Sequence, residues 1–109
     1  MAIIVNELIG NTLLVTINNP SKRNSMIIGF HDELQSTIKM ADNNKDVNAL
    51  IITGAGDFFC AGGDLNGLKT RRSMSEDERY DALSHLNGTI KAIFNCSKQL
   101  KIAFIVPFK

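Results

Sequence analysis

The residues of this sequence best suited to chemistry lie in a glycine-rich segment. Gly54, Gly56, Gly62 and Gly63 fall within ten residues, directly after an apolar run. Glycine lets a backbone bend sharply and approach a ligand more closely than a Cβ would allow. Backbone amides aimed at one point stabilise a developing negative charge, as in an oxyanion hole, where one donor is worth about 100- to 1,000-fold in rate. We favour a plain turn for Gly54 and Gly56, and the charge-stabilising role for the Gly62–Gly63 pair.

Other chemistries fit this region less well. A dinucleotide-binding loop also begins with a strand and Gly-x-Gly, but Phe59 stands where its third glycine would be, and no Gly-Lys-Ser/Thr phosphate loop occurs. Cys60 is more typical of a small buried thiol than of a nucleophile, because no histidine can be assigned as its base. An acid or base role for Asp64 is possible, although we favour a structural one.

The remaining cysteine and histidine residues form no recognisable metal motif. Cys60 and Cys96 are too few for a disulfide framework, and His31 and His85 complete no cluster of ligands. Both histidines fall on predicted helices, where ordinary packing is the default role. We therefore expect no metal site.

Composition indicates one folded, water-soluble domain spanning residues 1–109. The apolar share of 44% and the charged share of 21% are near globular averages. A net charge of +1 argues against a nucleic-acid partner. No apolar stretch approaches the roughly 20 residues of a membrane-spanning helix, and the N-terminal residues lack the basic region of a signal peptide. We expect a cytoplasmic protein without a membrane span.

Strands and helices are predicted to alternate around the glycine-rich segment. Residues 3–8 and 12–17 have the composition of two strands joined by a tight turn at Gly10–Asn11, and a polar loop with Pro20 follows at residues 18–24. Residues 49–53 are typical of a strand buried on both faces. Between them, an apolar stripe at helical spacing predicts a helix from Ser25: Ile27, Phe30, Leu34, Ile38 and Ala41. This order is typical of an α/β fold.

A second helix is predicted to start at Ser75. Ser75 and Glu78 have the spacing of a capping box. Its buried stripe would consist of Tyr80, Leu83, Leu86, Ile90 and Ile93. The basic residues Lys69, Arg71 and Arg72 fit an exposed linker before this helix. Residues 100–109 look like a strand, and we expect exposed apolar surface because few elements remain to cover the strand at residues 49–53.

Two segments of the sequence resemble one known family. Residues 18–26, Asn-Asn-Pro-Ser-Lys-Arg-Asn-Ser-Met, resemble the Asn-x-Pro-x-x-x-Asn-Ala-Leu segment of the crotonase superfamily, the enoyl-CoA hydratases and isomerases. Residues 51–65, Ile-Ile-Thr-Gly-Ala-Gly-Asp-Phe-Phe-Cys-Ala-Gly-Gly-Asp-Leu, resemble its second hallmark. The likeness extends from about residue 3 to residue 98. It implies the N-terminal turns of a β-β-α spiral, and homotrimers or hexamers as in the family.

The resemblance also implies a substrate and its contacts. In the family, an acyl-CoA thioester places its carbonyl oxygen against two backbone amides, and the first of these corresponds to Gly63. The loop residues that would line the coenzyme A path are Ala61, Gly63, Asp64, Leu65 and Asn66. Lys22 and Arg23 border the nucleotide end, where a guanidinium can meet a phosphate, although a solvated turn explains them equally well. Coenzyme A would be part of the substrate, and no separate cofactor is expected.

Parts of the family pattern have no counterpart in this sequence. Gln99 stands in place of the family's proline, and no glycine occurs after Gly88 to supply the second amide. The catalytic carboxylates of the family come beyond position 109. Two hypotheses follow: an enoyl-CoA hydratase/isomerase-like protein that stabilises an enolate with impaired activity because the second half is missing, or a non-catalytic module that binds acyl-CoA or a protein partner.

Overall fold

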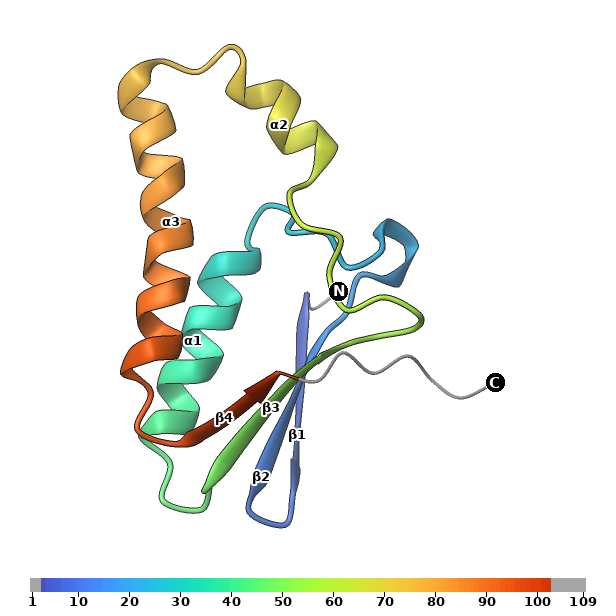
Figure 1. The fold of residues 1–109 in the computed structure, drawn as a ribbon, viewed down its shortest axis with the longest axis vertical. Coiled ribbons are helices and arrows are strands. Elements are labelled where there is room, and N and C mark those ends of the chain that lie inside the picture. Colours follow the sequence, from blue (N-terminus) through green and yellow to red (C-terminus); the bar gives the residue numbers. More distant parts are fainter. Residues whose placement is uncertain (1–2, 103–109) are drawn as a thin grey trace.

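The chain forms one four-stranded sheet with helices, as a computed structural model describes it for residues 3–102 (Figure 1). The predicted continuation of the last strand over residues 103–109 lies outside the described part. The elements in chain order are β1 (Ile4–Ile9), β2 (Thr12–Ile17), the short 3-10 helix η1 (Pro20–Lys22), α1 (Phe30–Asp42), β3 (Ala49–Gly54), α2 (Leu65–Arg71), α3 (Glu76–Asn95) and β4 (Gln99–Ile102).

The sheet confirms the predicted α/β architecture. Strands β1 and β2 form an antiparallel hairpin, and Gly10 has a φ of +60° in its turn. Strands β2 and β3 are parallel, as are β3 and β4, so α1 and α3 serve as the crossover helices. The strand order β1-β2-β3-β4 follows the sequence.

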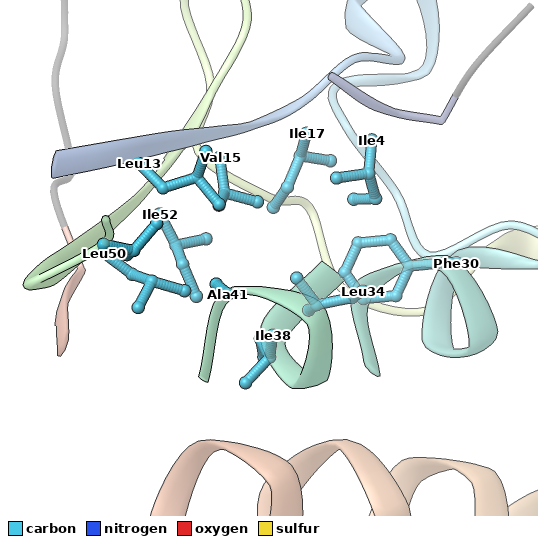
Figure 2. Packing of buried hydrophobic residues seen from close by; sticks show 11 residues of the cluster. Ile4, Leu13, Val15, Ile17, Phe30, Leu34, Ile38, Ala41, Leu50 and Ile52 are labelled. Atoms are coloured by element: carbon cyan, nitrogen blue, oxygen red, sulfur yellow. The ribbon is translucent and has the colours of Figure 1, made fainter. Parts of the chain in front are cut away.

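The hydrophobic core lies between one face of the sheet and α1 (Figure 2). Val15 and Leu50 are fully buried on the sheet side, and Phe30 and Ile38 face them from α1. The prediction that residues 49–53 are buried on both faces is only partly right, because Ala49 and Ile51 are half-buried. No helix of the described chain covers that second face, where Val5 and Ile9 of β1 are 44% and 55% exposed.

Helix α1 starts five residues later than predicted. Gly29, the residue before it, has a φ of +93°, which breaks a right-handed helix at that point. Met26 instead pairs with Gly63 as a short parallel bridge. Ile27 is therefore outside the helix, whereas the other four predicted stripe residues are buried as expected: Phe30, Leu34, Ile38 and Ala41.

Helix α3 has the predicted start but not the predicted buried face. The capping box forms in full, with Ser75 accepting from the Glu78 amide and the Glu78 carboxylate accepting from the Ser75 amide. Of the predicted stripe, Tyr80, Leu83 and Ile90 are exposed, with Tyr80 77% accessible. Leu86 is half-buried, and Ile93 packs against the hydrophobic core as predicted. Helix α3 contacts α1 through smaller residues instead, because Gly88 lies against the Gln35 side chain and Thr89 is buried beside it.

Helix α2 was not predicted. The segment interpreted as a linker with Lys69, Arg71 and Arg72 contains a seven-residue helix that ends at Arg71. Within residues 3–102, no helix combines the length and apolar character required to cross a membrane.

Candidate functional site

Asn24 joins the two motifs that the sequence singled out. Its side chain is fully buried and lies between the polar loop and the glycine-rich segment. Its Oδ1 accepts from the Asn19 amide at 2.8 Å, and its Nδ2 donates to the carbonyl oxygens of Ala55 at 2.8 Å and Phe58 at 2.6 Å. Asn24 has a φ of +58°, a left-handed conformation that asparagine tolerates better than most residues. The sequence analysis assigned no role to this residue.

Backbone hydrogen bonds also join the polar loop to the end of the glycine-rich segment. The Ala61 amide donates to the Arg23 carbonyl at 3.0 Å, and the Met26 amide donates to the Gly62 carbonyl at 2.8 Å. The position of the Gly62–Gly63 pair is therefore fixed from both sides by residues of the first motif.

Gly56 lies in the turn after β3, as predicted, whereas Gly54 is the last residue of β3 and pairs with Ile17. Gly54 has a steric reason to be glycine. A Cβ at position 54 would lie 2.3 Å from the Phe58 carbonyl oxygen, because the loop folds back over this residue. Gly56 has a φ of +73° and Gly62 a φ of +90°, conformations that favour glycine.

A cavity of about 610 Å³ opens beside Gly63. Its walls come from the segment before α1, the first turn of α1, helix α2 and the first half of α3. Gly63 itself is exposed, and none of the hydrogen bonds found among residues 3–102 uses its amide. The cavity brings together three of the predicted site residues, Gly63, Asp64 and Asn66.

Asp64 has the structural role that the sequence analysis favoured. It caps the N-terminus of α2, and its Oδ2 accepts from the Gly67 amide at 3.1 Å. This cap orients the chain directly after Gly63. Leu65 and Ala61 are both exposed and do not line the cavity.

Lys22 and Arg23 lie on the surface at the η1 turn, away from the cavity lining. The Arg23 guanidinium carbon is 5.9 Å from the centre of the Phe58 ring, within the range of a cation–π contact. This contact links the cation to the glycine-rich loop and leaves it accessible to solvent.

Two histidines that the sequence analysis assigned to ordinary packing also line the cavity. The His31 ring nitrogen Nδ1 lies 2.8 Å from the Thr89 hydroxyl, and the His85 Nδ1 lies 3.3 Å from the Asp32 carboxylate. Burial and the nearby His85 lower the pKa of His31, with Asp32 opposing the shift. These partners are up to 58 residues apart in the sequence, so no local spacing could indicate them.

The cysteines and acidic residues of the described chain form no recognisable metal site. Cys60 and Cys96 are both free and half-buried. Within the part of the chain that the structure describes, no group of three His, Cys, Asp or Glu residues could hold a metal ion.

Comparison with known proteins places this geometry in a family. The family model "Enoyl-CoA hydratase/isomerase" matches residues 8–104. The chain belongs to the enoyl-CoA hydratase/isomerase family. The solved structure of an enoyl-CoA hydratase from a Polaromonas species matches with a TM-score of 0.87 and 29% identity, over 93% of this chain and 39% of that one. The predicted crotonase-like α/β fold is thereby confirmed.

Relatives within the enoyl-CoA hydratase/isomerase family differ in their named activities. This chain is 32% identical over 91 residues to a peroxisomal Delta(3,5)-Delta(2,4)-dienoyl-CoA isomerase of Arabidopsis thaliana, covering 75% of this chain and 33% of that protein. It is 41% identical over 56 residues to the enoyl-CoA hydratase EchA19 of Mycobacterium tuberculosis, covering 51% of this chain and 21% of that protein. The chain thus spans about a fifth to a third of these relatives' length.

Proposed function

We propose that this chain binds an acyl-CoA thioester, with the thioester carbonyl oxygen accepting a hydrogen bond from the Gly63 amide. The observation that carries this proposal is the exposed Gly63 amide beside the cavity, on a backbone fixed by the Asn24 and Met26 contacts. A donor held in place before the ligand arrives costs little reorganisation and favours an enolate oxygen over a neutral carbonyl.

The cavity walls suit the acyl portion of such a ligand. Apolar side chains from α2, from α3 and from the segment before α1 line it, among them Leu68, Leu86 and Ile27. A mostly apolar pocket with a few polar groups is the usual form of a small-molecule site. We assign the acyl chain to this cavity, and the coenzyme A portion to the exposed loop with Ala61, Leu65 and Asn66.

The basic residues of the η1 turn complete the proposed site. Lys22 and Arg23 are exposed and available to phosphate groups of coenzyme A. Arginine offers planar, charge-assisted hydrogen bonds that match phosphate oxygens. We assign these two side chains to the nucleotide end of the ligand.

We propose that the chain both binds the thioester and stabilises its enolate, because the Gly63 amide is placed beside the cavity that would take the acyl chain. Proton transfer needs an acid or base within hydrogen-bond reach of the substrate. The alternative function is a non-catalytic acyl-CoA-binding module. Hydration of crotonyl-CoA, followed by ultraviolet absorbance, distinguishes the two, since slow turnover above the uncatalysed rate supports the first and none supports the second.

Two substitutions at position 63 test the role of the Gly63 N–H group, one that removes the group and one that keeps it. The Gly63→Pro variant lacks the N–H, whereas Gly63→Ala keeps it, and a Cβ at this position meets only Leu68 at 3.9 Å. By titration calorimetry with crotonyl-CoA, Gly63→Pro should bind about fivefold more weakly than Gly63→Ala, the value of one hydrogen bond. Free coenzyme A should bind both variants equally. Equal affinity of the two variants for the thioester would contradict the proposed role.

A further inference from the structure

Charged or titratable side chains line the cavity beside Gly63 within the described chain: His31, Asp32, Asp64, Arg71 and His85. A group that takes a proton from a ligand needs a lone pair that is not already in use. The Arg71 guanidinium has none, because it stays protonated in proteins. Asp64 uses its carboxylate to cap α2 through the Gly67 amide. The candidates for proton transfer are therefore the cavity residues on α1 and α3.

His85 and Asp32 are engaged with each other and exposed to solvent. His85 Nδ1 lies 3.3 Å from Asp32 Oδ1, and His85 Nε2 lies 3.9 Å from the Asp81 carboxylate. Both ring nitrogens of His85 thus face a carboxylate. The side chains of His85 and Asp32 are 49% and 72% exposed, so water competes with a ligand for them. Of these cavity residues, His31 remains.

His31 has one ring nitrogen in a hydrogen bond and one without. Its Nδ1 lies 2.8 Å from the Thr89 hydroxyl, across the contact between α1 and α3 (Figure 1). Thr89 accepts from Gln35 Nε2 at 3.0 Å and donates to the His85 carbonyl at 3.4 Å. Its remaining lone pair therefore accepts the Nδ1 hydrogen, which leaves the neutral His31 ring with a lone pair on Nε2.

The Nε2 atom of His31 is accessible. It takes part in no hydrogen bond found among residues 3–102, and no fully buried side-chain nitrogen in that range lacks a partner. Nε2 is therefore open to solvent, on a residue that lines the same cavity as Gly63. This places an unused proton acceptor and an unused amide donor on the wall of one cavity.

The surroundings hold the His31 ring in place and favour its neutral form. The buried Phe30 ring packs against it edge-on, with the ring centres 5.2 Å apart. Burial lowers the pKa of His31, and the nearby His85 lowers it further. Asp32 opposes this shift, and Arg71 adds a smaller lowering. The ring is thus unprotonated at neutral pH, as a base must be before it acts.

We propose that His31 is the general base of this site, and that its Nε2 takes a proton from the carbon next to the thioester carbonyl. The inference rests on the acyl-CoA site proposed above. The electron pair of the broken C–H bond moves onto the carbonyl oxygen, and the Gly63 amide stabilises the resulting enolate. The imidazolium exchanges its proton with solvent and returns one to the same carbon, so no further reactant is required. Thr89 is the positioning residue that keeps the lone pair on Nε2.

Hydrogen exchange of butyryl-CoA in heavy water tests this role, because it needs one base and one stabilised enolate. Mass spectrometry of the recovered thioester should show deuterium uptake next to the carbonyl that the unmodified chain accelerates. His31→Asn should slow this uptake by about 100-fold or more. The asparagine amide can still donate to Thr89, so the fold, checked by circular dichroism, and the affinity for butyryl-CoA in titration calorimetry should be retained.

A matched pair at position 89 tests the positioning role. Thr89→Val removes the hydroxyl that accepts from His31 and should slow exchange about fivefold, the value of one hydrogen bond. Thr89→Ser keeps the hydroxyl and should restore the rate. In the unmodified chain, exchange should accelerate as the pH rises through the lowered pKa of His31 and should then level off.

The outcomes separate this inference from the binding site on which it rests. An unmodified chain that fails to bind butyryl-CoA would overturn both. Binding without accelerated exchange, or exchange that His31→Asn leaves unchanged, would overturn the role of His31 alone. Exchange that is lost in His85→Asn and kept in His31→Asn would assign the proton transfer to His85 instead.

Discussion

Replacement of Asn24 by alanine should destabilise the chain more than any other single amide deletion in the described loops. Asn24→Ala removes three hydrogen bonds and leaves the Asn19 amide and the carbonyls of Ala55 and Phe58 without a partner. At about 1 kcal/mol each, these losses sum to about 3 kcal/mol. The left-handed φ of +58° adds about 1 kcal/mol for alanine. The total of about 4 kcal/mol is a large part of the roughly 5–15 kcal/mol that stabilises a typical domain.

Urea unfolding, analysed by linear extrapolation, measures this loss directly. Asn24→Gly separates the two contributions, because glycine loses the same hydrogen bonds without the conformational strain, and it should be about 1 kcal/mol more stable than Asn24→Ala. Asn43→Ala is the matched control, since Asn43 is exposed and makes one side-chain hydrogen bond, to the Lys39 carbonyl. A loss below about 1 kcal/mol for Asn24→Ala, similar to that of the control, would refute the assignment of Asn24 as the residue that holds the two loops together.

Two further predictions concern the loop after β3 and the histidine beside the cavity. Gly54→Ala should cost about 3 kcal/mol or more in urea unfolding, because its Cβ would lie 2.3 Å from the Phe58 carbonyl oxygen; a near-neutral effect would show that the loop shifts freely. The lowered pKa of His31 means that the folded chain favours the neutral ring. The neutral His31 ring therefore contributes its full stabilisation above a pH of about 6.5, the pKa of histidine in the unfolded chain. This stabilisation is lost as the pH falls through the lower pKa of His31 in the folded chain. His31→Asn should flatten this acid-side loss, and an unchanged pH profile would assign it to other groups.

Local signals in the sequence predicted those parts of the fold that depend on neighbouring residues. The hairpin and the capping box at Ser75 followed from turn and cap chemistry within a few positions. The start of α1 was misplaced because the apolar spacing continues through Ile27, whereas the φ of Gly29 decides where the helix begins. The buried face of α3 was misassigned in part, because Tyr80, Leu83 and Ile90 are exposed while the smaller Gly88, Thr89 and Ala92 lie on the packed side with Ile93.

The candidate site was predicted in part for the same reason. The glycine-rich motif singled out Gly63, Asp64 and Asn66, and the structure brings these three residues together at one cavity. Their role in binding a ligand stays a prediction. The pairing of His31 with Thr89 depends on the packing of two helices that are distant in the sequence, and no spacing rule covers it. Whether Lys22 and Arg23 contact a ligand stays a prediction.

The hydrogen bonds of Asn24 also constrain the order in which the molecule can assemble. They join residues 31 and 34 positions apart, across the whole β2-α1-β3 crossover. Contacts of such sequence separation form only after the intervening chain has closed, so the loop that carries Gly63 acquires its shape late in folding. The Gly63 loop should then open together with the sheet and not as an independent unit, and its amides should exchange with solvent deuterium at rates close to those of β3.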